Sequence, residues 1–167
     1  MKELKFKKID HVAIAVPDLD KGIALYQSLL GKKPEHIEEV ADQKVRAAFF
    51  GVGESNLELL FPTDPASPIS NFLQKNGRGG LHHICLEVEN IEERLKELKA
   101  KGVVLIDEKP RIGAHGKRIA FVHPKSTGGV LIELSETTLR SLSEVEANRP
   151  FNEAQGPHST NILEKTK

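Results

Sequence analysis

The sequence predicts an α+β fold made of two copies of one unit, in which a strand is followed by a helix and then by further strands. The first observation is a repeated segment: the run Ile9–Val16 (IDHVAIAV) recurs as Leu81–Val88 (LHHICLEV), with a histidine third in each. The second is that a polar cap, an amphipathic stretch and a glycine follow both copies. The third is that each half ends in a strand-like run with one glutamate, Glu58 or Glu133.

The first half opens with an alternating, β-branched run over residues 6 to 16, which is typical of a strand. Pro17 ends this strand, and Asp18 is placed to cap a helix that stops before Gly31. The apolar stripe of the helix is made of Leu19, Ile23, Tyr26 and Leu30. Three further strands are expected at 35–41, 44–51 and 56–61. We therefore expect one module over residues 6–61.

A linker over residues 62–80 joins the two halves. Three prolines interrupt regular structure at its start, and a glycine-rich run does so at its end. Between them we expect a short helix around 69–75. The linker therefore separates the first module from a second one over residues 81–136.

The second module repeats the plan of the first. A strand over 81–88 precedes a helix, which Asn90 and Glu93 begin as a capping box and Gly102 ends. Strands are then expected near 103–106, 117–122 and 130–135. Residues 137–167 have no counterpart in the first half, so we expect a polar C-terminal tail there, with a helix-compatible pattern from Thr138 to Asn148.

Composition limits the class of protein. The 167 residues suit one domain, which we place over residues 1–136. The 24 acidic and 24 basic residues balance, which argues against nucleic-acid and membrane partners. One cysteine excludes an internal disulfide framework. No apolar run reaches transmembrane length and the N-terminus has no signal-peptide core, so we expect a cytoplasmic protein, or a mitochondrial matrix protein if a transit peptide has been removed.

Strand alternation places the repeated polar residues on equivalent faces. Successive side chains of a strand point to opposite faces, so in each strand one face is bulky and apolar. The opposite faces carry four polar residues: His11, Glu58, His83 and Glu133. The bulky faces should pack beneath the helices, and the others should line a cavity. Asp10 and His82 are out of phase with the four, so we exclude both as metal ligands.

The four in-phase residues predict a metal site. Two neutral imidazoles and two carboxylates suit a divalent ion such as Co²⁺, Mn²⁺, Ni²⁺ or Zn²⁺. An octahedral ion with these ligands keeps two positions open for water or a bidentate substrate, whereas structural zinc sites are usually closed and sulfur-rich. The alternative is that each histidine is a hydrogen-bonded core residue, but a glutamate in an apolar strand is costly to bury unpaired.

Short motifs spread along the chain give a second line of inference. They are Asp10–Asp18 (DHVAIAVPD), Gly79–Ile84 (GGLHHI), Ile112–Lys117 (IGAHGK), His123–Lys125 (HPK) and Gly128–Leu134 (GGVLIEL). Together these motifs make residues 8 to 135 resemble the vicinal oxygen chelate superfamily and, within it, the methylmalonyl-CoA epimerases. The resemblance implies two tandem βαβββ modules that form a curved, partly open barrel-like sheet around a metal site, with helices on the outer face.

The same resemblance implies the ligands and the reaction. Members of the family bind metal at positions matching His11, His83 and Glu133, and a further position, Glu58 here, is glutamine in some members. Some epimerases have another glutamate, proposed as a base, where this chain has Ala47. The implied reaction interconverts (R)- and (S)-methylmalonyl-CoA through removal and return of the α-proton. Co²⁺ is the favoured ion, and the implied assembly is a homodimer.

For this chain we predict Glu133 as one catalytic base and Glu58, its counterpart in the first module, as the other. Glycine-rich loops offer free N–H groups and nearby positive charge for the anionic groups of an acyl-CoA substrate. The candidates for substrate binding are Gly113, His115, Gly116, Lys117 and Lys125. The alternative is an ordinary hairpin turn with solvated lysines.

Three other functions fit the same architecture. The His/Glu/His/Glu set also resembles glyoxalase I, so the protein could be a lyase acting on a glutathione hemithioacetal. Fe²⁺ bound by two histidines and one glutamate would suit a dioxygenase. Related folds without enzymatic activity sequester ligands in the cavity, although four in-phase polar residues argue against that alternative.

Overall fold

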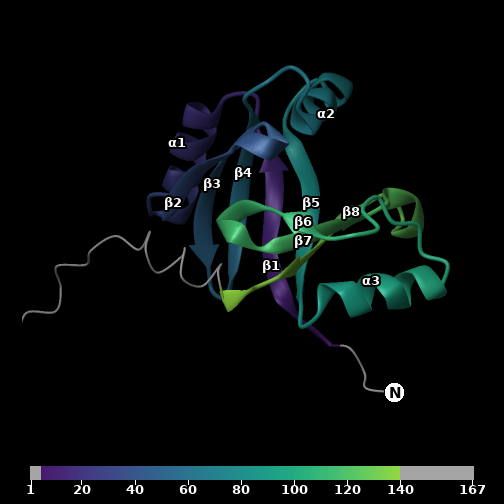
Figure 1. Cartoon of the computed structure of the whole chain (residues 1–167). Helices are drawn as coiled ribbons and strands as arrows, with labels where there is room; N and C mark the ends of the chain where they lie inside the picture. The colour runs from purple at the N-terminus through teal and green to yellow at the C-terminus, as the bar shows by residue number, and fades with distance from the viewer. Residues whose placement is uncertain (1–4, 140–167) are drawn as a thin grey trace, which may run out of the picture.

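The computed structural model describes residues 5–139, which form one eight-stranded sheet and three α-helices (Figure 1). The first module contains β1 (Phe6–Ala15), α1 (Leu19–Leu30), β2 (His36–Val40), β3 (Val45–Val52) and β4 (Ser55–Pro62). The linker contains α2 (Pro68–Asn76). The second module contains β5 (Gly80–Val88), α3 (Ile91–Ala100), β6 (Arg111–Ile112), β7 (Arg118–Val122) and β8 (Leu131–Glu136). The predicted curved α+β architecture is thus confirmed.

The sheet order is β2-β3-β4-β1-β5-β8-β7-β6, which places the two histidine strands side by side at its centre. β1 pairs with β4 in parallel, and β5 pairs with β8 in parallel. β1 and β5 run antiparallel and join the two halves. The two modules therefore meet along the strands that carry the repeated motif.

The helices begin and end where the sequence predicts. The side chain of Asp18 accepts a hydrogen bond from the Lys21 N–H at the start of α1, and that of Asn90 accepts one from the Glu93 N–H at the start of α3. Gly31 ends α1 with a φ of 68°, a left-handed conformation that glycine adopts without steric cost. Among the described residues no helix is long and apolar enough to cross a membrane.

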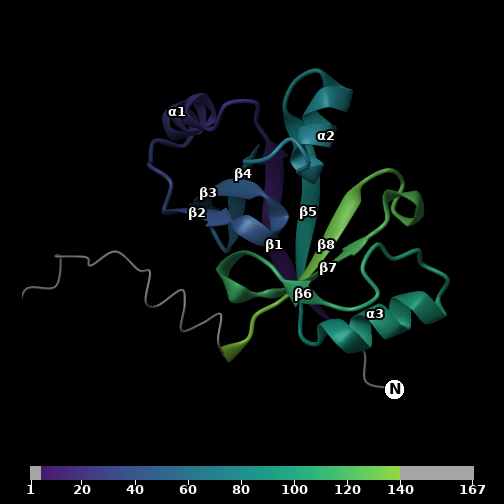
Figure 2. The same cartoon turned by 45° about the horizontal axis from the view of Figure 1, so that its top comes forward.

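The outer face of the sheet carries the bulky apolar side chains, as expected. Phe50 and Leu59 pack with residues of α1, and Leu134 and Val88 pack with residues of α3. Figure 2 shows these two helices beside the first and second halves of the sheet, respectively. The linker helix α2 differs, because its Ile69 packs in the cluster of the inner face. α2 thus covers one part of the inner face.

The prediction of a strand near 103–106 is wrong. Those residues make only an isolated bridge, Leu105 to Val122, and the last strand of the sheet is instead β6. The side chain of Asp107 accepts a hydrogen bond from the Phe121 N–H, so a side chain occupies a position that a ladder partner would need. The expected helix from Thr138 to Asn148 lies outside the described residues, apart from its first two positions.

Candidate metal centre

Two rows of residues across the sheet bring the four predicted ligands together. In one row Glu58 on β4 lies opposite Ala13 on β1, which lies opposite His83 on β5. In the other row His11 on β1 lies opposite Cys85 on β5, which lies opposite Glu133 on β8. Each row spans three strands with a small residue in the middle. The small side chains of Ala13 and Cys85 leave space in which the longer ones can meet.

The four side chains are buried, and both glutamates approach the Nε2 atoms of the two histidines. The Nε2 atoms of His11 and His83 are 3.1 Å apart. The Oε2 atom of Glu133 lies 2.8 Å from His83 Nε2 and 3.7 Å from His11 Nε2. The Oε2 atom of Glu58 lies 3.2 Å from His11 Nε2 and 3.9 Å from His83 Nε2. The ligand atoms of His11, His83 and Glu133 all lie within 4.8 Å of one another, and Glu58 approaches the two histidines from β4 without joining that group of three.

These separations fit a divalent ion. Atoms bound about 2.1 Å from one ion lie about 3.0 Å apart when adjacent in an octahedron, and about 4.2 Å apart when opposite. The measured separations run from 2.8 to 3.9 Å. Two carboxylates and two imidazoles buried together also need a shared cation or proton to offset their loss of hydration. The residues present thus suit a metal ion.

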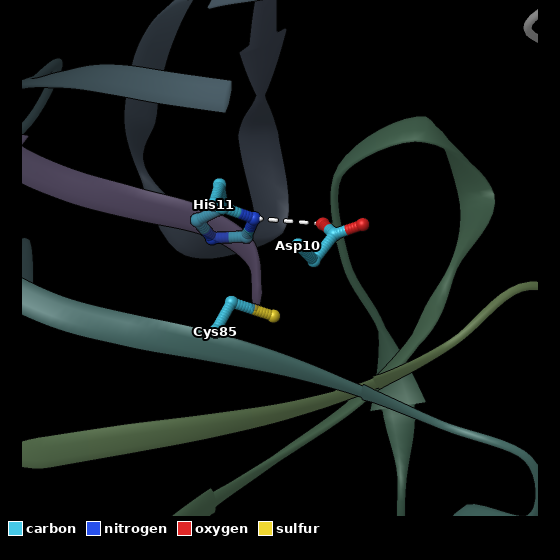
Figure 3. Close-up of side chains that lie close together, drawn as sticks. All are labelled: Asp10, His11 and Cys85. Carbon is cyan, nitrogen blue, oxygen red and sulfur yellow. Dashed lines mark hydrogen bonds and ion pairs between the residues drawn. The ribbon is translucent and has the colours of Figure 1, made fainter. Parts of the chain in front are cut away.

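Asp10 orients the first ligand. Its Oδ2 atom lies 2.9 Å from His11 Nδ1 (Figure 3). Its other oxygen lies 2.5 Å from Lys117 Nζ. Burial opposes the charge of Asp10, but the hydrogen bond from His11 and the charge of Lys117 outweigh it and hold the pKa of Asp10 well below its usual range. A carboxylate on the outer nitrogen of a metal-binding histidine fixes the ring and raises its basicity.

His82 has the equivalent position beside the second ligand. Its Nδ1 atom lies 2.8 Å from His83 Nδ1. Burial, together with the nearby His83, lowers the pKa of His82 to about 4. Neutral His82 can therefore accept a hydrogen bond from the Nδ1–H of the His83 tautomer whose Nε2 is free to bind a metal. Both candidate ligands thus have Nδ1 partnered on the outside and Nε2 directed to the common point.

Strand alternation excludes Asp10 and His82 as ligands but does not predict these two neighbouring positions. The signal was present in the sequence, because each directly precedes a candidate ligand histidine. In β1 a register shift between Ile9 and His11 also alters the alternation on which the phase argument depends.

Comparison with known proteins decides the family. Residues 10–121 match the model of the Glyoxalase/Bleomycin resistance protein/Dioxygenase superfamily. The human protein named methylmalonyl-CoA epimerase, mitochondrial, is 46% identical over 129 residues, which are 77% of this chain and 73% of that protein. The chain belongs to the glyoxalase/bleomycin resistance/dioxygenase superfamily.

Solved structures of superfamily members agree in fold. Methylmalonyl-CoA epimerase from Mycobacterium tuberculosis has a TM-score of 0.77 and 37% identity, over 83% of this chain and 93% of that one. A variant of Streptomyces coelicolor methylmalonyl-CoA epimerase in complex with 2-nitronate-propionyl-CoA has a TM-score of 0.76 and 35% identity, over 81% of this chain and 97% of that one.

In this superfamily member the two buried glutamates have different environments. Burial raises the pKa of Glu58 above its usual value. Burial acts on Glu133 in the same direction, but hydrogen bonds from His11 and His83 outweigh it and hold the pKa of Glu133 well below its usual range. Burial raises the pKa of the Cys85 thiol to about 12, which keeps it protonated at neutral pH and disfavours a ligand role (Figure 3).

A cavity of about 510 Å³ opens onto the centre and is lined by all four predicted ligands. Apolar side chains such as Leu60, Ile69 and Phe121 form much of its wall. The basic residues in its lining are Lys44, from the turn between β2 and β3, and Arg111, from β6. A cavity of this size can hold the acyl end of a substrate beside the centre. The sequence analysis singled out neither basic residue.

The predicted substrate-binding residues have other contacts. Lys117 is committed to Asp10, and its side chain is only 18% exposed. The Gly113 N–H donates to the carbonyl of Lys117, so that loop amide is already used. Gly116 has a φ of 64°, His115 packs on the ring of Phe49, and Lys125 lies in the short turn Pro124–Ser126. In the described structure Lys117 thus pairs with the carboxylate that contacts His11.

Replacing Asp10 by Asn is expected to weaken metal binding about 10- to 100-fold, as loss of a carboxylate behind a ligand histidine does elsewhere. The amide cannot accept the His11 proton with the same charge, and Lys117 loses its anionic partner. Competition with a metal-binding dye measures the affinity. Asp20→Asn on the exposed side of α1 is the matched control and should change nothing. An affinity of Asp10→Asn equal to that of the native protein would contradict the supporting role.

Proposed function

We propose that this protein is a metal-dependent isomerase, an epimerase that interconverts (R)- and (S)-methylmalonyl-CoA. The convergence of His11, Glu58, His83 and Glu133 beside a substrate-sized cavity is the observation that supports this proposal most strongly. The identity of 46% to the human epimerase supports the same substrate. The substrate is an acyl-CoA whose α-carbon lies between a thioester and a carboxylate.

The reaction needs a group that removes the α-proton and a group that returns one from the opposite side. His11, Glu58, His83 and Glu133 would hold a divalent ion, which would supply Lewis-acid stabilisation of the charge that develops on the thioester oxygen. We propose Glu133 as the base on one side, because its carboxylate lines the cavity beside both histidines. Its two imidazole neighbours hold that carboxylate in place.

Glu58 is proposed as the acid–base group on the other side. It occupies in the first module the position that Glu133 occupies in the second, since β4 pairs with β1 as β8 pairs with β5. Its carboxyl group also lines the cavity. Ala47, on the neighbouring strand β3, is buried and carries no carboxyl group. On that side of the two histidines, Glu58 is therefore the carboxyl group closest to them among the described residues.

Several finer properties belong to the same proposal. Mixed nitrogen and oxygen ligands suit Co²⁺, Mn²⁺, Ni²⁺ and Zn²⁺, and among these we propose Co²⁺, the ion that the resemblance to the epimerases implies. We also infer a homodimer that acts in the cytoplasm, or in the mitochondrial matrix if the source is a eukaryote. Metal analysis of untagged protein and light scattering at known concentration test the ion and the assembly.

Assay of two substrates tests the proposed function. Metal-loaded protein is given a single epimer of methylmalonyl-CoA, and the appearance of the other epimer is followed. A parallel sample receives a glutathione hemithioacetal, because the His/Glu/His/Glu set also suits a lyase and a Salmonella typhimurium lactoylglutathione lyase is 29% identical over 126 residues. We expect turnover of the CoA ester. Turnover of the hemithioacetal alone would contradict the proposal.

The charged end of CoA is expected at the cavity mouth, next to Lys44 and Arg111. Their side chains are 46% and 44% exposed, and each lies more than 3.4 Å from its nearest carboxylate: Lys44 is 3.5 Å from Asp64 and Arg111 is 3.7 Å from Asp107. These loose pairs leave both cations able to bind phosphate. The nucleotide of CoA is too highly charged to enter the apolar cavity and must lie outside it.

Arg111→Ala is therefore expected to raise KM for the CoA ester about tenfold with little change in kcat, which corresponds to one lost charge-assisted hydrogen bond. The same variant should behave as native on the methylmalonyl thioester of N-acetylcysteamine, which has no phosphates. Lys21→Ala, on the exposed side of α1, is the control. An equal rise in KM for both substrates would refute phosphate binding by Arg111.

A further inference from the structure

A second cluster of metal-binding side chains lies away from the four-ligand centre. His36 and Glu38 come from β2, and His115 comes from the turn Ala114–Gly116 that follows β6. β2 and β6 are the opposite ends of the sheet, so this cluster joins the two ends across the inner face. None of the three residues belongs to the first centre or to its supporting shell.

The three side chains face one another at distances too long for hydrogen bonds. His115 Nδ1 lies 3.6 Å from Glu38 Oε1, and His36 Nε2 lies 3.7 Å from Glu38 Oε2. One ligand atom from each residue lies within 4.8 Å of those from the other two. Tetrahedral ligands about 2.1 Å from one zinc ion lie about 3.4 Å apart. The spacing therefore suits an ion between the groups better than direct contact.

Two atoms of the cluster lack the partners that buried polar atoms require. His36 Nε2 and Glu38 Oε1 are shielded from solvent and have no hydrogen-bond partner. Such atoms are rare in folded proteins, and each one usually marks a bound ion, a water or a functional role. The two unsatisfied atoms are an imidazole nitrogen and a carboxylate oxygen, which together attract a cation.

The surroundings hold the cluster in place. The ring of His115 packs 4.5 Å from the ring of Phe49 and 4.9 Å from that of His36, measured between centroids. The backbone of His115 has a φ of 54°, an uncommon conformation for a residue with a side chain. This fold therefore keeps His115 against β2 despite a local conformational cost. Lys117, the nearest basic residue of the same loop, is paired with Asp10.

We propose that His36, Glu38 and His115 bind a second divalent cation of the Zn²⁺ type, which ties β2 to the loop after β6. Two imidazoles and one carboxylate are a common set for such ions, and water completes the coordination. Burial lowers the pKa of His115, which favours the neutral imidazole that binds metal. The bound cation links β2, at one end of the sheet, to the turn after β6, at the other end. This proposal does not depend on the epimerase activity.

Metal titration of the untagged, metal-depleted full chain tests the proposal. Calorimetry with Zn²⁺, followed by metal analysis of the desalted protein, should give two ions per native chain. Glu38→Gln and His115→Ala should each bind one, with affinity at the second site reduced at least tenfold. The double variant His11→Ala, His83→Ala should also bind one, because it retains the second cluster. His123→Asn, outside both clusters, is the control and should bind two.

Thermal unfolding provides a second readout for the same variants. Addition of a second equivalent of Zn²⁺ should raise the Tm of the native chain and leave that of Glu38→Gln unchanged. Circular dichroism of each metal-depleted variant shows whether it has folded, and His36→Ala replaces any variant that has not. One ion per native chain, millimolar affinity for the second ion, or two ions in Glu38→Gln would each overturn the proposal.

Discussion

Replacing Glu133 by Gln is expected to reduce epimerisation and α-hydrogen exchange about a thousandfold, within the range that loss of a general base produces. The amide has nearly the shape of the carboxylate and can still bind a metal ion through oxygen, but it cannot take a proton. The exchange is measured in D₂O by the loss of the α-hydrogen signal of methylmalonyl-CoA, and the metal content is measured on the same sample.

The matched control for Glu133→Gln lies on the same strand. Glu136→Gln removes a carboxylate that pairs with Arg118, outside the metal centre, so its exchange rate should remain native. Native exchange in Glu133→Gln with its metal retained would show that Glu133 is not the base. If the metal is lost as well, Glu133→Asp, which keeps a carboxylate, should recover the metal and part of the exchange.

Replacing His83 by Ala is expected to have the second large effect. The variant should lose the metal bound at this centre, and its activity should fall more than a hundredfold. Loss of a residue that merely supports a metal ligand already lowers metal affinity 10- to 100-fold. His83 is itself a candidate ligand, and its Nε2 atom lies 2.8 Å from the Glu133 carboxylate. The variant also leaves the Glu133 carboxylate with one imidazole neighbour, His11, instead of two. Mass spectrometry of metals and the epimerase assay follow the two losses.

A control at an exposed histidine separates this effect from a general response to the substitution. His123→Ala is expected to retain both metal and activity, because the His123 side chain is exposed and accepts a hydrogen bond from the Lys125 N–H of its own turn, away from the metal centre. Imidazole added to His83→Ala should restore part of the metal binding by filling the space. Full metal content in His83→Ala without added imidazole would show that His83 is not a ligand.

Much of the fold follows from local signals in the sequence. The apolar stripe of α1, its Asp18 cap and its Gly31 stop predicted that helix within a residue of its observed bounds. Alternation predicted which face of each strand is buried beneath a helix. The strand near 103–106 failed because a side chain, that of Asp107, replaced the backbone partner, which no alternation pattern reveals.

The convergence of the candidate site was predicted for a specific reason. The sequence repeat places each candidate ligand at an equivalent position of its module. Strand alternation alone therefore predicted that His11, Glu58, His83 and Glu133 share one face of the sheet. Features that depend on contacts between distant segments were missed. Lys44 and Arg111 line the same cavity although they lie 67 positions apart in the sequence, and Glu38 lies near His115 only because the curved sheet brings β2 close to the turn after β6.

Anomalous X-ray diffraction from crystals of the Co²⁺-loaded protein tests the central claim most directly. That claim is that side chains from both modules hold one divalent ion at the point where they converge. A strong peak within bonding distance of the Nε2 atoms of His11 and His83 and of the carboxylates of Glu58 and Glu133 is expected. An anomalous difference map with no peak among these four groups, from crystals shown to contain cobalt, would contradict the claim.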